Sequence, residues 1–531
     1  MQNYKEKYCT LIVITMIFVG SVFITSDKFG NTVNDAKLYF TILSSLILLI
    51  AASFFINGFK RLISSYKSLD LALCFSVVGA INAIYGWLQY YGVMISHHLD
   101  FSVTGSFENP AGYAAVQTLV FSISLYYSLS KTCKSAQTIF IASSLLILSS
   151  IVISQSRTAI LGVIVSSGII CYCEVHNFRR IVSKKWVIVI MALSVVGIIL
   201  SLYLWKKDSA DGRLFIWFNC LTMIADKPLF GFGHNGFTGN YMNYQAAYFS
   251  LNPDSQYAAL ADNIIHPFNE YLKLTVEYGM IGLLISAVSL VLIVIHIVRT
   301  NQSQKGLLLA LLASFIIFCS FSYPFHYAPV WFLLLYLFFR ILPDSVLGKT
   351  SSKLVSYSII TILIMAFGLT SFMMYNDMKW AEISKRSLMG QTNKMLPYYA
   401  KIKNFKSHDP LFLYNYSAEL NVVGRYEKSL SIIDEYLPDL NDYDVQLLIG
   451  DDYTKLGRTE EALNVYKKAS LMIPNRFVPL YNIMKIYQSV NEEDSARIIA
   501  EQIVYKPVKI KSVSISAIID EAFIVLNKDN R

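Results

Sequence analysis

Five residues of this 531-residue chain have types and positions that suit proton transfer and the binding of a charged group. Glu270 follows His266 by four residues, and Glu277 lies a further seven residues on. A helix through this segment would place all three side chains on one broad face. An imidazole beside carboxylates can exchange a proton at neutral pH. Because Arg157 and Arg213 are predicted to lie on the same side of the membrane as this segment, we interpret His266 as catalytic rather than structural.

A glycine-rich turn lies between Arg213 and His266. Residues 211–217 begin a predicted helix, which ends at the sequence KPLFGFGHNG of residues 227–236. Glycines there permit close approach of the backbone to a ligand. Because their G-x-G-x-x-G spacing follows a helix and opens no βαβ unit, we do not expect a dinucleotide site. The substrate-binding residues predicted in this region are Trp217, Gly231, Gly233, His234 and Asn235.

Two further outward connections carry candidate site residues. Asn109 precedes Pro110 in GSFENPAG (105–112), and this order suits a helix start because proline is tolerated in the first turn. A helix cap and a substrate-binding residue are both open interpretations of Asn109. Arg157 lies at the predicted membrane edge, where an arginine is costly and usually paired or functional. A snorkelling membrane anchor is the alternative for Arg157.

The composition predicts a polytopic membrane protein. Hydrophobic residues make up 54% of the chain and charged residues only 15%, whereas soluble domains have about 25% charged residues. This excludes an ordinary cytosolic enzyme and a disordered chain. The net charge of +9 forms no basic stripe, so we expect no nucleic-acid partner. Eleven apolar stretches have the length of a span: 9–26, 38–58, 71–93, 110–130, 136–154, 158–174, 186–205, 279–298, 306–323, 326–342 and 355–375.

The distribution of lysine and arginine predicts the orientation. These residues gather in alternate connections, whereas residues 94–109 contain none. The positive-inside rule then places the N-terminus in the cytoplasm and everything after residue 375 outside. We therefore predict an all-α fold: a transmembrane domain of residues 1–378 with a long outward loop (206–265), and an outward helical-repeat domain of residues 379–531.

Residues 447–475 closely resemble a tetratricopeptide repeat (TPR). Gly424 lies 33 residues before Gly457 and Asn491 lies 34 residues after it, close to the known period of 34. Such helix pairs bury one face each and need stacked neighbours, and we predict about three repeats over 410–505. A groove for a protein partner and a rigid cap are both open. The residues at the expected places are Tyr453, Gly457, Ala462 and Pro474.

Taken in order, the outward motifs resemble the bacterial O-antigen ligase and O-antigen polymerase family. The motifs are SRTA (156–159), GRLFIW (212–217) followed by KPLFGFGHNGF (227–237), and HPFNEYLKLTVEYGMIGLL (266–284). The resemblance covers residues 10–345. Many members place asparagine directly after the histidine, whereas Pro267 and Phe268 come first here.

This resemblance implies a fold like the GT-C membrane glycosyltransferases in the bacterial inner membrane. Such a protein transfers a glycan from undecaprenyl diphosphate to an acceptor hydroxyl at the periplasmic face, with no metal, nucleotide sugar or other cofactor. Arg157 and Arg213 would hold the diphosphate, since guanidinium groups bind phosphate bidentately. His266 would be the general base, oriented by Glu270 or Glu277. Lipid A-core sugar, a growing glycan and a protein hydroxyl are the open acceptors, corresponding to a ligase, a polymerase and a protein O-oligosaccharyltransferase.

Three alternatives come from other classes. Zinc could be bound by several of the outward histidines, which are His97, His98, His234, His266, His326 and His408, but none has metal-ligand spacing. A membrane scaffold displaying the repeats would give no reason for the outward arginines. A transporter of lipid-linked glycans should show repeated helices and charges in mid-membrane, and the sequence shows neither clearly.

Overall fold

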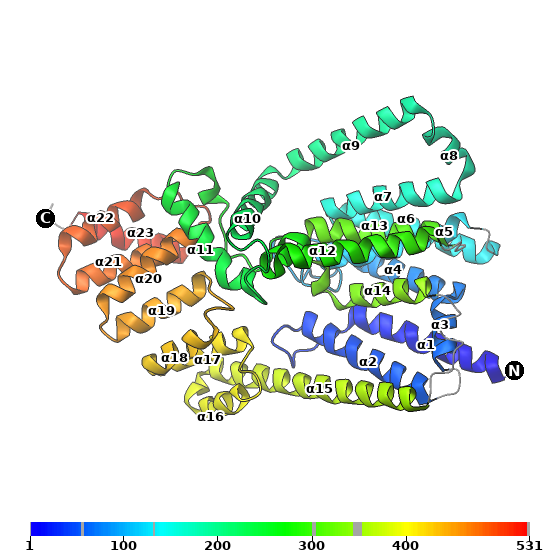
Figure 1. Cartoon of the computed structure of the whole chain (residues 1–531). Helices are drawn as coiled ribbons and strands as arrows, with labels where there is room; N and C mark the ends of the chain where they lie inside the picture. Colours follow the sequence, from blue (N-terminus) through cyan, green and yellow to red (C-terminus); the bar gives the residue numbers. More distant parts are fainter. Residues whose placement is uncertain (1, 55–57, 131–132, 300–303, 343–352, 528–531) are drawn as a thin grey trace. The chain divides into compact units, whose positions relative to one another are not determined.

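The computed structural model describes residues 2–54, 58–130, 133–299, 304–342 and 353–527 (Figure 1). Within these ranges the chain forms helices and no β-strand, which confirms the all-α prediction. The chain divides into two compact units, each assembled from several stretches. The first unit contains Met1–Leu202, Phe268–Glu270 and Ala287–Glu382, and the second contains Tyr203–Pro267, Tyr271–Ser286 and Ile383–Arg531.

Every predicted span falls on a helix, although residues 55–57 of the second one lie outside the described ranges. Within the described chain, six helices are long and apolar enough to cross a membrane. They are α2 (Asn34–Phe54), α4 (Leu69–Tyr90), α6 (Lys134–Ile153), α7 (Arg157–Glu174), α12 (Glu270–Arg299) and a helical stretch Tyr357–Lys403 that includes most of α15 (Lys353–Arg386). The other predicted spans correspond to α1 (Gln2–Phe23), α5 (Pro110–Leu129), α9 (Lys185–Trp205), α13 (Lys305–Phe321) and α14 (Ala328–Ile341). Two short helices, α3 (Gly58–Tyr66) and α8 (His176–Val182), lie between them in the chain.

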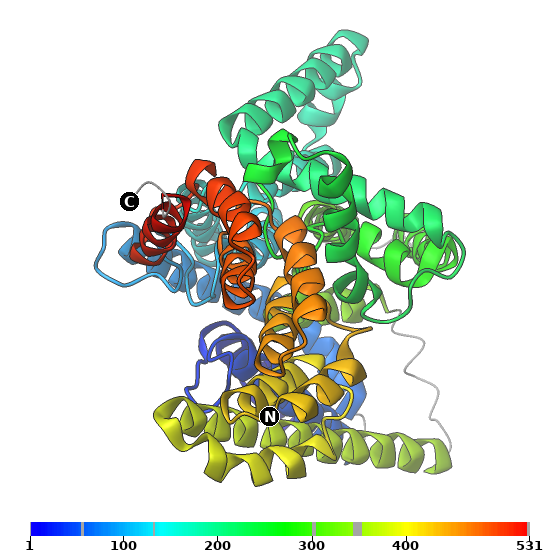
Figure 2. The same ribbon diagram turned by 90° about the vertical axis from the view of Figure 1, so that its left-hand side faces the viewer.

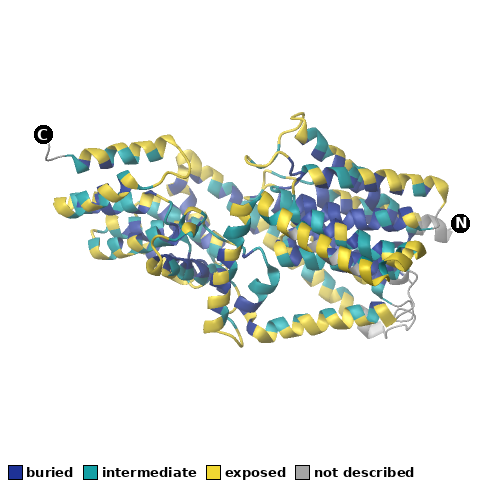
Figure 3. Ribbon diagram, turned by 90° about the horizontal axis from the view of Figure 1, so that it is seen from above, coloured by how far each residue is buried: buried dark blue, intermediate teal, exposed yellow. Residues whose placement is uncertain are grey.

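Helix α5 forms the centre of the first unit, where it packs against α4, α6, α7 and α13. Figure 3 shows the buried residues of this bundle in dark blue. Burial extends along nearly all of α5 and includes the polar Gln117 and Ser124. Gln117 Nε2 donates to Gly79 O at 3.1 Å, and Ser124 Oγ donates to Ser76 Oγ at 2.8 Å. Because an unpaired polar group is costly in an apolar interior, these bonds fix how α5 meets α4.

The long predicted loop is helical and packs with the C-terminal segment in the second unit. It contains α10 (Lys207–Asp226), α11 (Gly236–Leu251) and a 3-10 turn at Gln256–Ala259. Helix α11 packs against α20 (Thr459–Met472). Gln245 Nε2 donates to Met472 O at 2.6 Å, and Thr238 Oγ1 donates to Asp439 O at 2.7 Å. The second unit is therefore held together by contacts between segments about 200 residues apart in sequence.

Consecutive helix pairs make up the C-terminal segment, and they follow one another in Figure 2 from yellow to red. Gly424, Gly457 and Asn491 have φ angles of 77°, 73° and 59°, each in the turn between the two helices of a pair. The sequence period therefore corresponds to a repeated helical hairpin with a left-handed residue in its turn. The helices are α16 (Thr392–Lys403), α17 (Pro410–Val422) with α18 (Tyr426–Tyr436), α19 (Tyr443–Lys455) with α20, α21 (Val478–Ser489) with α22 (Glu493–Tyr505), and α23 (Val513–Leu526).

Candidate functional site

A hydrogen bond joins helix α10 to the segment of His266. Trp217 Nε1 donates to Pro267 O at 2.9 Å, and both residues belong to the second unit. Arg213 lies one turn before Trp217 on α10, so the two side chains share a helix face. On the other side of α10, the buried Phe215 packs against Tyr248 and Tyr257, with ring centroids 4.9 and 5.0 Å apart. The helix is thus anchored on one face and contacts the histidine segment with the other.

The expected shared helix face of His266, Glu270 and Glu277 is wrong in one respect. Helix α12 begins at Glu270, and His266 lies in the irregular segment before it. A following proline disfavours helical backbone at His266, and Phe268 has a φ of 55°, outside the right-handed helical region. His266 is therefore positioned by the chain around Pro267 and not by the helix of the two glutamates.

The glycine turn holds the start of α12 within the second unit. Phe232 N donates to Val276 O and Gly233 N donates to Glu277 O, both at 2.8 Å. Gly231 has a φ of 69°, and a Cβ atom there would lie 2.5 Å from Val276 O. Gly231 therefore lets the backbone approach α12 closely, and the N–H groups of residues 232 and 233 are occupied by hydrogen bonds to α12.

Helix α12 breaks at Gly279, which has φ 67° and ψ −169°. Met280 N donates to Pro228 O at 2.8 Å, so the turn before Gly231 occupies the break. A Cβ atom at residue 279 would lie 2.0 Å from Leu229 O. The glycine turn and the break therefore fit one another, and together they fix where Glu277 stands.

His234 and Asn235 end the same turn. His234 Nδ1 lies 3.3 Å from Tyr278 Oη, and the imidazole interacts electrostatically with Glu277. Asn235 has a φ of 57° and its carbonyl oxygen accepts from Thr238 Oγ1 at 3.0 Å at the start of α11. The turn thus brings His234 and Glu277 together, a pairing that the sequence did not predict.

Arg157 is the first residue of α7 in the first unit. Ser156 caps the helix by accepting from Ala159 N at 3.4 Å. The Arg157 guanidinium donates from Nη1 to Leu202 O, at the end of α9, at 3.1 Å. The guanidinium is half-buried and joins two helix ends at the edge of the bundle.

Asn109 caps α5, as one of its two interpretations expected. Its Oδ1 accepts from Ala111 N at 2.9 Å and from Tyr327 Oη at 2.8 Å. Its Nδ2 donates to Tyr323 Oη at 3.0 Å. The Tyr323 ring also contacts Phe268 at 5.6 Å, so this cap lies beside the segment that leads into Glu270.

A carboxylate–imidazole pair, absent from the predicted site, lies next to this cap in the first unit. Glu108 Oε1 and His326 Nε2 are 3.3 Å apart, with 31% and 37% of the side chains exposed. Asn31 Nδ2 donates to Glu108 Oε2 at 2.8 Å, and Asn34 Nδ2 lies 2.9 Å from His326 Nε2. Burial alone would raise the pKa of Glu108, but the bonds from His326 and Asn31 hold this pKa below its ordinary value. Glu108 is therefore ionised at neutral pH.

A buried lysine lies near this pair. Lys37 is 1% exposed, and its Nζ donates to Ile24 O at 2.9 Å and lies 5.4 Å from the centre of the Phe107 ring. Sequence reasoning missed the Glu108–His326 pair because its members are 218 residues apart. One signal was available in the sequence: both residues lie at the ends of connections between spans that are predicted to face the same side of the membrane, and Glu108 lies within the GSFENPAG segment.

The predicted site residues are divided between the two units. The first contains Asn109, Arg157 and Glu270. The second contains Arg213, Trp217, Gly231, Gly233, His234, Asn235, His266 and Glu277. Among the residues that the structure describes, no group of three or more His, Cys, Asp or Glu side chains is arranged to hold a metal ion.

Comparison with protein families supports the resemblance seen in the motifs. Residues 142–287 match the sequence profile of the O-antigen ligase family. A comparison with curated proteins gave no match. The apolar helices indicate a membrane protein, and this match indicates a region that is similar to the O-antigen ligases. That region extends from α6 into α12 and therefore includes both Arg157 and His266.

Proposed function

We propose that this protein transfers a glycan from undecaprenyl diphosphate to an acceptor hydroxyl at the periplasmic face of the bacterial inner membrane. One observation carries the proposal: the region that matches the O-antigen ligases, residues 142–287, contains Arg157, Arg213 and His266 together. These are the three residues whose chemistry the transfer needs. The orientation rests on the alternation of basic connections along the sequence.

The arginines stabilise the leaving group in this proposal. When the bond between the sugar carbon and the diphosphate oxygen breaks, the electron pair and the negative charge stay on undecaprenyl diphosphate. A guanidinium is always protonated and matches two phosphate oxygens at once. Positioned before the reaction, Arg157 and Arg213 would stabilise that charge as it develops.

His266 accepts the proton of the acceptor hydroxyl as the hydroxyl oxygen attacks the sugar carbon. A neutral imidazole suits this step near pH 7. Trp217 and Pro267 hold the backbone beside His266, and Glu270 or Glu277 would orient the imidazolium. The turn of Gly231, Gly233, His234 and Asn235 would border the substrate, and Asn109 is proposed as a further substrate-binding residue.

Transfer to lipid A-core sugar is the acceptor choice that agrees with the matched family. Polymerisation of a glycan and transfer to a protein hydroxyl use the same chemistry with other acceptors. The TPR-like helix pairs of residues 410–505 would bind a protein partner or acceptor. The reaction as proposed needs no metal, so activity should persist in a chelator, whereas a loss restored by zinc would contradict this part of the proposal.

The decisive experiment is deletion of the gene, with envelope lipopolysaccharide, capsule and glycoprotein separated on gels and stained for glycan. Complementation would use the wild-type gene, Arg213→Ala, and Lys207→Ala as a matched control, since Lys207 is an exposed cation on the same helix. We expect loss of one glycan class, restored by the wild type and Lys207→Ala but not by Arg213→Ala.

The pattern of the lost glycan identifies the acceptor. Unmodified core indicates a ligase, core with one repeat unit a polymerase, and bare glycoprotein a protein transferase. Unchanged glycans, or full rescue by a membrane-inserted Arg213→Ala variant, would overturn the proposal in favour of a scaffold or a transporter.

A further inference from the structure

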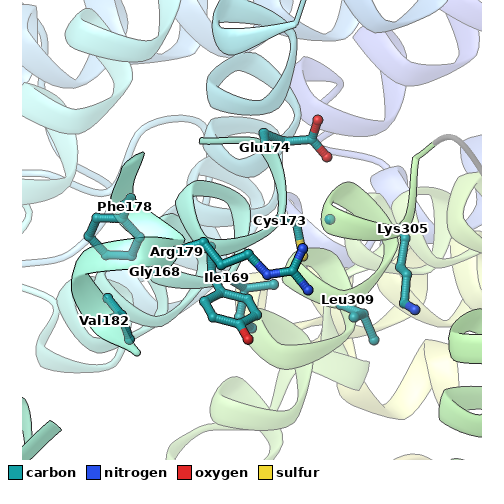
Figure 4. Close-up of a pocket in the computed structure, with 11 residues that line it drawn as sticks. Gly168, Ile169, Cys173, Glu174, Phe178, Arg179, Val182, Lys305 and Leu309 are labelled. Carbon is teal, nitrogen blue, oxygen red and sulfur yellow. The ribbon is translucent and has the colours of Figure 1, made fainter. Parts of the chain in front are cut away.

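A cavity of about 680 Å³ lies in the first unit at the end of α7 that is opposite to Arg157 (Figure 4). The last turns of α7, helix α8 and the first turn of α13 line it. Ile169, Phe178 and Leu309 give it an apolar wall. The cavity is remote from Arg157, since α7 has 18 residues and an α-helix rises about 1.5 Å per residue.

Three helices each contribute one charged side chain to this cavity. Glu174 ends α7, Arg179 lies on α8 and Lys305 begins α13 (Figure 4). A Cβ atom on Gly306 would lie 2.9 Å from Glu174 Oε1, so the carboxylate stands beside the first turn of α13. The Arg179 guanidinium lies 5.2 Å from the centre of the Tyr172 ring, and Lys305 Nζ donates to Val298 O at 3.0 Å.

These charges do not neutralise one another. Within the described part of the chain, Glu174, Arg179 and Lys305 form no ion pair within 4 Å. All three line the same cavity as the Cys173 thiol. One cavity thus presents two cations and one anion, each available to a ligand, beside an apolar wall.

The arrangement of these charges indicates the chemical class of the ligand. Arginine and lysine together suit a phosphate group, and basic pockets at the ends of membrane helices bind lipid headgroups. A carboxylate in the same cavity would repel a purely anionic headgroup but would attract an ammonium group. The apolar wall suits the glycerol and the first methylenes of acyl chains.

We propose that this cavity binds the headgroup of a zwitterionic phospholipid that carries phosphoethanolamine. Arg179 and Lys305 contact the phosphate, and the Glu174 carboxylate pairs with the ammonium group. The acyl chains extend along Ile169 and Leu309. Under the orientation derived from the basic connections, this lipid belongs to the cytoplasmic leaflet. The inference is independent of the proposed glycan transfer and goes beyond it.

Native mass spectrometry of the purified full-length protein tests the assignment. The protein would be released from a non-ionic detergent after incubation with equal concentrations of phosphatidylethanolamine and phosphatidylglycerol of the same acyl composition. We expect the wild type to retain more phosphatidylethanolamine. Glu174→Gln should lower the ratio of the two bound lipids by about two- to fivefold, the range for one solvent-exposed charge interaction, without losing phosphatidylglycerol. Because the ratio is measured on folded molecules that bind lipid, partial unfolding does not change it.

Further variants test whether lipid binding depends on this cavity or on nearby basic residues in general. Arg179→Ala should reduce binding of both lipids, whereas the matched control Arg180→Ala, an exposed neighbour on α8 that does not line the cavity, should not. Equal effects of Arg179→Ala and Arg180→Ala, or an unchanged ratio in Glu174→Gln, would overturn the proposal. Displacement of the lipid by an equimolar amount of soluble glycerophosphoethanolamine would show that the ligand is a free headgroup compound and not a membrane lipid.

Discussion

The indole N–H of Trp217 donates to the carbonyl oxygen of Pro267 at 2.9 Å. This bond joins the helix of Arg213 to the residue that follows His266, across 50 residues of sequence. It is a direct structural link between two of the motifs by which the O-antigen ligase resemblance was drawn. Trp217 therefore acts, in our proposal, by positioning the backbone of the general base.

Trp217→Phe should lower kcat while leaving KM nearly unchanged, because phenylalanine keeps an aromatic side chain there but removes the indole N–H that donates to Pro267 O. A net hydrogen bond contributes about 0.5–1.5 kcal/mol, so we expect a decrease of about two- to tenfold. The measurement is transfer kinetics on purified protein. Trp87→Phe, which removes an indole bond to Ser149 Oγ in the bundle, is the control and should change kcat little. Equal kcat values for both variants would contradict a positioning role.

His266→Ala should reduce kcat by about 10²- to 10⁴-fold, which is the usual contribution of a general base. The donor should still bind, because the arginines remain. Transfer kinetics and a donor-binding assay would separate these effects. His176→Ala, on helix α8 of the first unit, serves as the control for loss of an imidazole. Normal turnover in His266→Ala would remove this residue from the mechanism.

The Glu108–His326 pair predicts a dependence of stability on acid pH. Since hydrogen bonding lowers the pKa of Glu108, the ionised form contributes stability that is complete above its ordinary pKa and is lost as the pH falls through the lowered value. Glu108→Gln should lower Tm at pH 7 by about 1–4 °C and flatten the decline of Tm between pH 5 and 3. Glu382→Gln, which breaks the exposed pair with Lys379, should change the profile less. Parallel profiles for the wild type and Glu108→Gln would exclude this contribution.

Gly279→Ala should destabilise the second unit and reduce transfer. Alanine at a φ of 67° costs about 1–2 kcal/mol, and its Cβ would lie 2.0 Å from Leu229 O. Thermal unfolding and transfer assays on the same preparation would measure both effects. Gly368→Ala is the control, because this helical glycine has open space around it and alanine is the better helix former. An unchanged Tm in Gly279→Ala would contradict the rigid fit between the break in α12 and the glycine turn.

The buried Asp452, in the helical repeats, predicts a dependence of stability on pH that is opposite in sign to that of Glu108. Burial raises the pKa of Asp452 to about 6, and its Oδ2 is buried without a hydrogen-bond partner. Because the unfolded chain loses this proton at lower pH, Tm should fall as the pH rises from about 4 to about 6 and then level off. Asp452→Asn should remove this fall and raise Tm at pH 7.5 by about 2–4 °C.

The neighbouring Asp451 provides the matched control for this measurement. Asp451 accepts from the same Asn421 side chain at 2.8 Å, so Asp451→Asn tests the loss of a carboxylate at nearly the same place. A profile for Asp452→Asn that parallels the wild type between pH 4 and 6 would show that Asp452 does not cause the dependence.

The helices were predictable because each apolar run carries its own signal. All eleven predicted spans fall on helices, and the left-handed turns at Gly424 and Gly457 were marked by glycine. The start of α12 was not predicted correctly, since the helix-face argument for His266 ignored the restriction that Pro267 places on the residue before it. Local sequence rules were sufficient where one residue decides the backbone.

The pairing of distant segments was not predictable from one sequence. The Glu108–His326 pair, the contact of α11 with α20 and the fit of Gly231 against Val276 all depend on where separate segments meet. Hydrophobic periodicity and residue type do not indicate which distant segments pack together. The Glu108–His326 pair was therefore missed, although both residues belong to connections that the sequence predicts to face the same side of the membrane.

The buried polar side chains of α5 also bear on how the protein enters the membrane during synthesis. Helix α5 has 20 residues, yet it is not among the six helices whose apolar character suffices for a span. A helix is inserted one segment at a time according to its own hydropathy, whereas the partners of Gln117 and Ser124 lie on α4. Because α4 precedes α5 in the chain, we expect α4 to stay beside the translocon until α5 emerges, so that the two helices enter the lipid as a pair.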